Sequence, residues 1–417
     1  MIRYRAFVLS ILLLPALLSA QTTRVLFIGN SYTYSNDLPG MFTQLAASMG
    51  ETVQTQMVAP GGYTFEGHTS YAQTQAALAQ GNWDFVVLQE QSQRPAFPPE
   101  QVAQEVLPYA AQLAQQARAA SPCAEVVYLM TWGRENGDAA NCAFYPPVCT
   151  YEGMQQRLYE SYVEMAAAND GWCAPAGEVW RTHRAAFPGT GLYTDGSHPN
   201  VLGSYIAAST LASTLFRRSC ATATYIPAGI TTEQAQSVRT MASDVVASPD
   251  APWNIGVNDP VAAADLNYLD GYTVLFADNT TGAASWSWDF GDGSGSTDAD
   301  PLHTYAGPGE YAVWLVVQDA CERTDSLQLT VTLVNTGIGE NGRSTTSTVR
   351  MVDGQLQVTS GVGGMLQLFD PAGKSLLSTT VTGGPRSITL PSDYQGVLVW
   401  QLSTLDGLSS TGRLHVP

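Results

Sequence analysis

Short apolar runs alternate with longer helical stretches through residues 21–247, and this alternation restricts the possible folds more than any other feature. Residues 25–28, 85–88 and 126–130 form the apolar runs, and residues 177–180 lie near a further strand end. Uninterrupted runs of this length are typical of strands buried on both faces of a parallel sheet. Helical stretches separate them at residues 38–49, 101–120, 154–168 and 199–216. The sequence therefore predicts an α/β fold, a doubly wound parallel sheet flanked by helices.

The composition changes near Ser248-Pro249-Asp250-Ala251-Pro252, which is typical of a linker. Beyond it the pattern is β only, with alternating runs such as residues 311–317, so we expect two small all-β sandwich domains. The predicted organisation is a signal peptide at 1–20, an α/β domain at 21–247, a linker at 248–257, a β-sandwich at 258–335, a linker at 336–348 and a last β domain at 349–417.

The first twenty residues have the pattern of a secretory signal. Arg3 and Arg5 precede an apolar run at residues 6–18, and Ser19-Ala20 supplies small residues for cleavage just ahead of Gln21. A transmembrane anchor is the alternative, but the run is shorter than the roughly 20 residues that a span needs. No later stretch is long and apolar enough. We therefore expect a secreted or surface-attached protein with no membrane span.

The net charge of −18 excludes two classes of partner. Lys374 is the only lysine, so the chain offers no basic field to displace counterions from nucleic acid. An anionic membrane surface is disfavoured for the same reason. We expect neither as a partner.

Six cysteines in an exported chain are expected to pair. Cys142 and Cys149 flank a Pro-Pro loop and are predicted to bridge each other, and a bridge between Cys123 and Cys173 is a second prediction. That leaves Cys220 and Cys321, which we expect to be free. With no Cys-x-x-Cys pair and five histidines without paired spacing, we expect no metal and no cofactor.

Three residues have the types and positions needed for acyl transfer by a serine. Ser31 lies just past the first apolar run, where Gly29 allows the chain to turn sharply from strand to helix. Asp195 and His198 share one short segment ahead of the last helical stretch, with Pro199 suited to a first helical position. Such sheets gather active sites at the carboxyl ends of their strands. A nucleophile, a base and an orienting carboxylate are therefore predicted in one place.

These segments resemble the blocks of the SGNH/GDSL hydrolase superfamily. Gly29-Asn30-Ser31-Tyr32-Thr33 is similar to its first block, and Asp195-Gly196-Ser197-His198 to its last. The resemblance implies a flavodoxin-like SGNH fold, with Ser31 as nucleophile and Asp195 and His198 completing the triad.

The resemblance also implies an oxyanion hole. Its donors are the backbone N–H of Ser31, a glycine N–H from the second block, for which Gly62 is the candidate, and an Asn amide from the third block. The third block departs from the pattern, because Gln89-Glu90-Gln91-Ser92-Gln93 contains no Gly-x-Asn. Gln91 or Gln93 is expected to substitute, since a Gln amide donates the same hydrogen bond.

Further polar and aromatic residues are candidates around this site. Trp132 and Arg134 follow the third apolar run with Glu135 and are predicted to line the substrate cleft. The alternative is an ion pair on the rim, packed against an aromatic ring. His68 could act as a second base, but a loop histidine with satisfied hydrogen bonds is the favoured interpretation.

The two trailing blocks also carry resemblances. The segment from Trp286-Ser287-Trp288-Asp289-Phe290-Gly291-Asp292-Gly293 to Gly309-Glu310-Tyr311 looks like a PKD domain, an immunoglobulin-like β-sandwich. Trp286 could be a binding aromatic, with a packing role favoured. Residues 366–374 and 396–402 resemble the C-terminal sorting domain of the type IX secretion system, which implies that machinery as a partner and outer-membrane export.

We therefore predict a secreted serine esterase that hydrolyses acyl, chiefly acetyl, esters by a Ser-His-Asp mechanism. An acylated polysaccharide is the expected substrate class. The alternative is a catalytically inactive surface protein for carbohydrate binding or adhesion, which the missing Gly-x-Asn favours.

Overall fold

The computed structural model describes residues 22–269, 272–334, 348–352, 355–360, 363–370, 374–390, 396–404 and 409–416. The predicted signal peptide and nearly all of the predicted linker at 336–348 lie outside these ranges. The chain divides into two compact units, Met1–Leu333 and Val334–Pro417, which are described separately.

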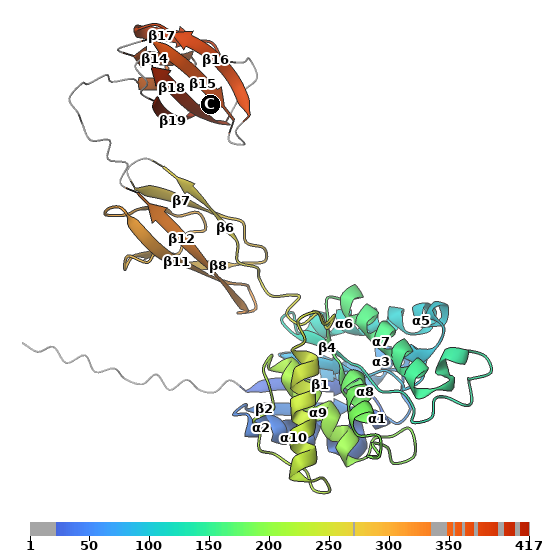
Figure 1. The fold of residues 1–417 in the computed structure, drawn as a ribbon. Coiled ribbons are helices and arrows are strands. Elements are labelled where there is room, and N and C mark those ends of the chain that lie inside the picture. The colour runs from blue at the N-terminus through green and yellow to red at the C-terminus, as the bar shows by residue number, and fades with distance from the viewer. Residues whose placement is uncertain are drawn as a thin grey trace, which may run out of the picture. The chain divides into compact units, whose positions relative to one another are not determined.

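A parallel five-stranded sheet forms the centre of the first domain (Figure 1), which confirms the predicted fold class. Its strand order is β2-β1-β3-β4-β5. The strands are β1 (Thr23–Ile28), β2 (Val53–Val58), β3 (Phe85–Leu88), β4 (Glu125–Leu129) and β5 (Trp172–Ala174). The apolar runs became β1, β3 and β4, the three inner strands. The edge strand β2 is rich in Gln and Thr and was not predicted, because only its last residue is buried.

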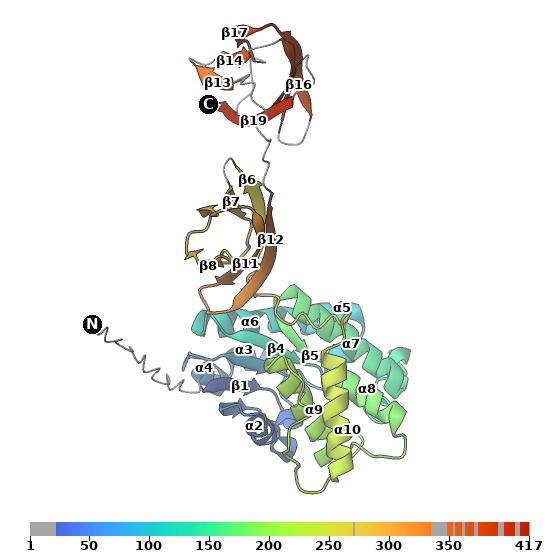
Figure 2. The same ribbon diagram turned by 60° about the vertical axis from the view of Figure 1, so that its left-hand side comes forward.

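Helices cover both faces of this sheet (Figure 2). On one side Val25, Phe27 and Val127 pack against α2 (Leu38–Ser48), α8 (Ala176–Ala186), α9 (Val201–Leu215) and α10 (Thr232–Val246). On the other side Leu26 and Ile28 pack with α3 (Phe65–Ser70), α4 (Ala72–Leu78), α5 (Pro99–Glu105), α6 (Leu107–Ala120) and α7 (Tyr151–Ala168). Because successive strand side chains point to opposite faces, one apolar strand supplies both cores. The short elements are α1 (Ser31–Tyr34), η1 (Ser35–Asp37), η2 (Arg94–Ala96) and η3 (Pro146–Cys149).

One local prediction is corrected, and one helix was not predicted. The helix expected over 101–120 is two helices that meet at Val106, because Pro108 in the first turn of α6 could not continue a preceding helix. Residues 177–180, predicted to lie near a strand end, lie in the first turn of α8, directly after β5 ends at Ala174. Helix α10 follows α9 and was not predicted.

The rest of the described chain is β structure. Strands β6 to β12 form a three-stranded sheet, β10-β7-β6, and a four-stranded sheet, β12-β11-β8-β9, around one apolar core. Their bounds are β6 (Ala264–Tyr268), β7 (Thr273–Asp278), β8 (Ser285–Asp289), β9 (Gly295–Ser296), β10 (Leu302–Thr304), β11 (Gly309–Gln318) and β12 (Thr324–Leu333).

The second compact unit also holds two antiparallel sheets, β13-β14-β17 and β16-β15-β18-β19, around a core of its own. Its strands are β13 (Thr348–Val352), β14 (Gln355–Ser360), β15 (Gly364–Phe369), β16 (Ser375–Val381), β17 (Gly384–Ile388), β18 (Gly396–Thr404) and β19 (Ser409–Val416). Both trailing blocks are thus all-β, as predicted.

Two disulfides are present in the described residues. Cys142 and Cys149 are bonded as predicted, but Cys123 pairs with Cys321 and not with Cys173. Cys173 and Cys220 are free and buried. The Cys123–Cys321 bond joins the segment before β4 to the turn between β11 and β12, 198 residues apart.

An ion pair lies beside the Cys123–Cys321 bond. Arg323 contacts the carboxylate of Glu125 at 2.5 Å, and the Asn258 amide donates to the same carboxylate at 2.8 Å. Since Glu125 is buried and lies on β4, these contacts and the disulfide fasten the β11–β12 turn to the first domain.

Candidate active site

Ser31, His198 and Asp195 form a continuous chain of hydrogen bonds. Ser31 is the first residue of α1, directly beyond the carboxyl end of β1, and the other two residues lie in the loop that leads into α9. The Ser31 hydroxyl lies 2.9 Å from His198 Nε2, and His198 Nδ1 lies 2.7 Å from Asp195 Oδ2. This is the order of groups with which a serine can be deprotonated for attack.

Hydrogen bonds to Gln89, the first residue after β3, hold the turn that carries Ser31. The Gln89 side-chain oxygen accepts from the backbone N–H of Asn30 at 3.0 Å and from the Thr33 hydroxyl at 2.8 Å. A Cβ at Gly29 would lie 2.3 Å from the Thr33 hydroxyl oxygen and 2.7 Å from the Gln89 oxygen. Only glycine therefore lets the chain pass so close to these two side chains.

His68 holds the same turn from another side. Its Nε2 lies 2.8 Å from the Gly29 carbonyl oxygen, and its Nδ1 lies 2.7 Å from the Thr74 hydroxyl. Because the imidazole is fully buried, its pKa is lowered, and the neutral form can donate to Gly29. His68 is the satisfied loop histidine that the sequence favoured, with both ring nitrogens engaged.

The Asp195 carboxylate organises its own loop as well as the imidazole. It accepts from the backbone N–H of Ser197 at 3.0 Å and of His198 at 2.7 Å, both through Oδ1. Hydrogen bonds from the His198 backbone and ring, joined by that from Ser197, lower the pKa of Asp195 to about 2. The carboxylate is therefore charged at neutral pH, although about half of the side chain is exposed.

A stack of three aromatic rings contacts the loop that carries Asp195 and His198. Tyr32 stacks on Trp132 with centroids 4.9 Å apart, and Trp132 stacks on Trp180 at 4.3 Å. The Tyr32 hydroxyl lies 2.7 Å from the Ser197 hydroxyl, and the Trp132 indole N–H donates to the Ser197 carbonyl at 3.3 Å. Only 1% of Trp132 is exposed. The prediction that Trp132 lines an open cleft is therefore wrong, and its contacts place it under the histidine loop.

Two backbone N–H groups near Ser31 have no acceptor within the described part of the chain. They belong to Ser31 itself and to Gly62, which has a φ of +70° in the turn before α3. The Asn30 amide donates to the Tyr63 carbonyl at 2.9 Å and so ties this turn to the Ser31 turn. Both N–H groups are the ones predicted as oxyanion donors, and both are free to donate to a ligand.

Gln91 and Gln93 have partners of their own. The Gln91 oxygen accepts from the backbone N–H of Gln93 at 2.8 Å, and its amide nitrogen donates to the Gln93 side-chain oxygen at 3.2 Å. The Gln93 amide nitrogen donates to Asp138 at 2.6 Å. Among the described contacts, neither amide reaches Ser31, so the third oxyanion donor stays a prediction.

Arg134 belongs to the same polar cluster. Its guanidinium lies 3.2 Å from the buried Asp138 carboxylate, to which Asn141 also donates at 2.7 Å. About a quarter of the Arg134 side chain is exposed. The residue therefore lies at the rim in an ion pair, and its predicted contact with substrate is untested.

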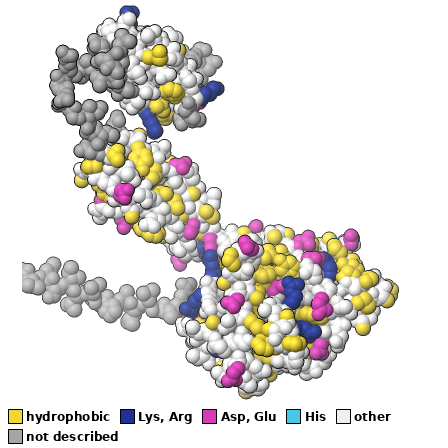
Figure 3. All heavy atoms as spheres, in the orientation of Figure 1, with side chains coloured by type: hydrophobic (Ala, Val, Ile, Leu, Met, Phe, Trp, Pro, Cys, Tyr) yellow, Lys and Arg dark blue, Asp and Glu magenta, His cyan; other side chains and the backbone are white. Residues whose placement is uncertain are grey.

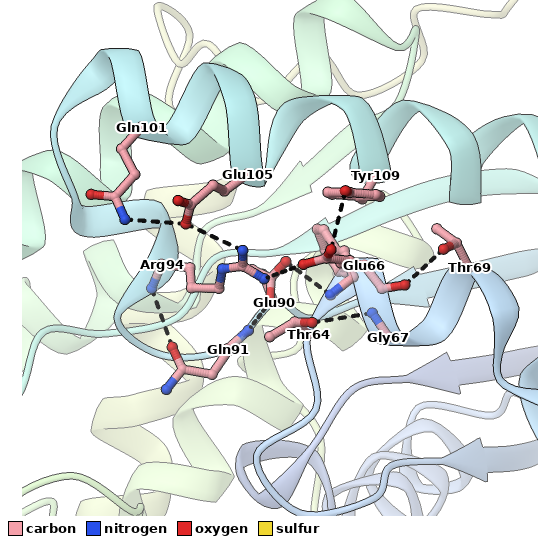
Figure 4. A network of polar contacts seen from close by, with 11 residues as sticks. Thr64, Glu66, Gly67, Thr69, Glu90, Gln91, Arg94, Gln101, Glu105 and Tyr109 are labelled. Carbon is pink, nitrogen blue, oxygen red and sulfur yellow. Dashed lines mark hydrogen bonds and ion pairs between the residues drawn. The ribbon is translucent and has the colours of Figure 1, made fainter.

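Glu90 is a buried carboxyl at the end of β3, and Figure 4 shows it among the polar contacts that surround Arg94. It accepts from the backbone N–H of Phe65 at 2.9 Å and of Gln91 at 2.5 Å. Burial raises its pKa to about 7, against the effect of those two donors and of Arg94. Glu90 thus joins the start of α3, next to the Gly62 turn, to the loop after β3.

Arg94 extends this network to the surface. Its guanidinium lies 3.3 Å from Glu66 on α3 and 3.2 Å from Glu105 on α5 (Figure 4). Both carboxylates are about half exposed, so each pair contributes little on its own. The network positions three segments and contains no group in contact with Ser31.

Sequence reasoning missed Gln89, Glu90 and the supporting role of Tyr32. Gln89 and Glu90 directly follow the apolar run of β3, and polar residues at that position lie at the carboxyl edge of a parallel sheet. That signal is present in the sequence, whereas Gln91 and Gln93 were predicted only from the resemblance to the third block.

Two family models match parts of the chain. Residues 63–245 match a domain of unknown function, DUF4886, and residues 257–334 match the PKD domain. The chain contains a DUF4886 region and a PKD domain. The DUF4886 match includes Asp195 and His198 but begins after Ser31.

Solved structures and a curated protein are also similar. A DUF4886 family protein from Bacteroides uniformis ATCC 8492 is 20% identical, with a TM-score of 0.47, over 55% of this chain and 97% of that one. An SGNH hydrolase candidate from Slackia heliotrinireducens is 33% identical, with a TM-score of 0.39, over 47% of this chain and 100% of that one. Collagenase ColQ1 of Bacillus cereus (strain Q1) is 39% identical over 57 residues, 14% of this chain; the chain thus spans only 6% of the collagenase.

Proposed function

We propose that the α/β domain hydrolyses carboxylic esters by an acyl-enzyme mechanism. Ser31 is the nucleophile, His198 the general base and Asp195 the group that orients the imidazole. The observation that carries the proposal is the hydrogen-bond chain from the Ser31 hydroxyl through both ring nitrogens of His198 to the Asp195 carboxylate. Because the carboxylate is charged at neutral pH, it holds the proton on Nδ1 and leaves Nε2 free to take one from Ser31.

The reaction has two steps. His198 takes the hydroxyl proton as Ser31 Oγ attacks the ester carbonyl carbon, and the same proton then goes to the departing alcohol. Water attacks the acyl-enzyme while His198 takes its proton; the bond to Ser31 then breaks, His198 returns the proton to Ser31 Oγ, and the acid leaves. In both steps the carbonyl oxygen carries negative charge, which the unengaged N–H groups of Ser31 and Gly62 would stabilise.

The proposed setting is outside the cell. Two disulfides in the described residues support an oxidising compartment, and the PKD domain fits an exported protein. Export through the signal peptide at 1–20 and the type IX machinery is part of the proposal, as is an acylated, chiefly acetylated, substrate. Within the described ranges no helix combines the length and apolar character that crossing a membrane requires.

Hydrolysis of 4-nitrophenyl acetate tests the proposal. Ser31→Ala should lower kcat/KM by about a thousandfold or more, because removing the nucleophile leaves only the oxyanion donors. Ser70→Ala, at the exposed end of α3, is the matched control and should keep the wild-type rate. A wild-type protein with no activity would favour the alternative of an inactive binding or adhesion protein, and a Ser31→Ala variant with full activity would refute Ser31 as the nucleophile.

A further inference from the structure

A hollow of about 620 Å³ opens in the first domain beside the loop that carries Asp195 and His198. Its walls come from the loop after β4, the start of α7, the last turn of α8 and the segment that follows α8. The side chains that matter for its chemistry are those of Glu135, Tyr151, Glu152, Arg181, Arg184 and Phe187. We call this the Arg184 hollow.

The Arg184 hollow is directly connected to the proposed catalytic loop. The backbone N–H of Glu135 donates to the Gly196 carbonyl at 2.8 Å, and Gly196 lies between Asp195 and Ser197. The Asn200 amide, just after His198, donates to the carbonyl of Gly191, another lining residue, at 2.9 Å. Two hydrogen bonds therefore join lining residues of the hollow to the segment that carries Asp195 and His198.

Arg184 presents an unpaired guanidinium to the hollow. It lies over the Tyr151 ring at 4.1 Å and donates to the Glu135 carbonyl at 3.2 Å, and in the part of the chain that the structure describes it has no carboxylate partner. The guanidinium carries five N–H donors, of which the Glu135 carbonyl engages one. Arg181, by contrast, is paired with Glu178.

The other charges make a simple anion site a poor fit. Glu135 and Glu152 also line the hollow, and among the described ion pairs neither has a cationic partner. With Arg181 balanced by Glu178, one free guanidinium faces two carboxylates. Figure 3 shows basic and acidic side chains interspersed over the face that it draws. A ligand that needs both donors and acceptors, without net charge, matches this lining better than a phosphate or a uronate.

Phe187 adds an apolar face to the polar lining. The ring is 41% exposed, directly after α8, and its aromatic contact is with His183 beneath it at 5.1 Å. An exposed ring among hydrogen-bonding groups suits a flat molecule with an apolar face and polar edges. A pyranose ring has that chemistry, because its C–H groups form a face and its hydroxyls both donate and accept.

We propose that the Arg184 hollow is a subsite for neutral sugar rings, so that the substrate is an acylated neutral glycan with its ester at Ser31. Arg184 would donate to ring hydroxyls, Glu135 and Glu152 would accept from them, and Phe187 would stack on a ring. This inference rests on the proposed esterase function. Sugar binding in the hollow can, however, be measured without turnover.

The first experiment compares kcat/KM for 4-nitrophenyl acetate with that for acetylated xylose and acetylated xylo-, manno- and cello-tetraose. At least one tetraose should exceed the monosaccharide by about tenfold or more. Phe187→Ala and Glu152→Ala should each lower kcat/KM for that tetraose about fivefold to tenfold, as expected for one lost stacking or hydrogen-bonding contact, and leave 4-nitrophenyl acetate within about twofold. Phe144→Ala, which removes an 86% exposed ring on another loop, is the matched control and should change neither.

The second experiment measures binding of the unacetylated tetraoses to the Ser31→Ala protein by calorimetry, with a neutral tetrapeptide for comparison. Binding that is lost in Ser31→Ala/Phe187→Ala supports the subsite even if the wild-type protein hydrolyses no ester, in which case only the esterase function fails. Four results would overturn the subsite: tetraoses no better than monosaccharide, no effect of Phe187→Ala and Glu152→Ala, an equal loss in Phe144→Ala, or preferential binding of the peptide.

Discussion

The exchange of Asp195 for asparagine tests how the proposed triad sets the proton on His198. Asp195 Oδ1 accepts from two backbone N–H groups, those of Ser197 and His198. An asparagine must keep its carbonyl oxygen there, so its NH₂ group is forced to face His198 Nδ1. The imidazole would then carry its proton on Nε2, where it blocks removal of the Ser31 proton. Asp195→Ala leaves the ring free to adopt either tautomer.

The expected losses follow from the geometry. The pKa of Asp195 falls to about 2 from an ordinary 3.8, so the native environment favours the carboxylate by roughly 2.5 kcal/mol at about 1.4 kcal/mol per pKa unit. The side chain is about half exposed, and solvent screening reduces this to roughly 1 to 1.5 kcal/mol. This stabilisation keeps the charge of Asp195 beside the imidazole, and because Asp195→Ala removes that charge we expect kcat to fall about tenfold or more. In Asp195→Asn, the tautomer that can deprotonate Ser31 has its proton on Nδ1 and would place two donors face to face. This raises the barrier by roughly a further 2 to 3 kcal/mol, so the total loss in kcat is about a thousandfold.

Initial rates with 4-nitrophenyl acetate give kcat and KM for both variants, and thermal unfolding checks that each is folded. We expect kcat to fall in the order wild type, Ala, Asn, with KM within about threefold. An Asp195→Asn variant as active as Asp195→Ala, or either with more than a third of wild-type kcat, would refute the role given to Asp195.

Two stability predictions follow. The pKa of Glu90 is about 7 in the folded protein and 4.5 ordinarily, so the stability supplied by its neutral form is present at pH 5 and is lost as the pH rises through 7. The Tm of Glu90→Gln should therefore lie below that of wild type by an amount that shrinks between pH 5 and pH 8. A Tm difference that stays constant over this range would contradict the prediction. Replacing both Cys123 and Cys321 by serine should destabilise the chain by about 5 kcal/mol in the chain-entropy model, against about 2.5 kcal/mol for the Cys142/Cys149 pair, because the closed segments span 198 and 7 residues. Equal shifts in chemical denaturation would contradict the second.

Most of what could be predicted of the fold and the site came from local patterns in the sequence. The apolar runs that became β1, β3 and β4 are buried on both faces, so their sequences contain little but apolar residues. Ser31 and the Asp195–His198 segment were found because each sits where a strand ends or a helix begins. Candidate residues at such positions can therefore be singled out without knowledge of their contacts.

Local sequence patterns could not predict which distant residues pair or pack together. Cys123 and Cys321 are 198 residues apart, and no periodicity connects the start of β4 with the β11–β12 turn. Trp132 looked like a cleft residue because it follows a strand at the carboxyl edge. Its burial depends on Tyr32 and Trp180, which stack on either side of it from distant parts of the chain.

The Cys123–Cys321 bond has a consequence for a chain that is pulled or cut. It closes a covalent ring that contains the linker at 248–257 as well as Asp195 and His198, whereas Ser31 lies outside the ring. Tension applied beyond residue 321 passes through the bond to Cys123 and bypasses the histidine loop. A single protease cut anywhere between these two cysteines would leave the PKD domain covalently attached to the domain that carries Ser31.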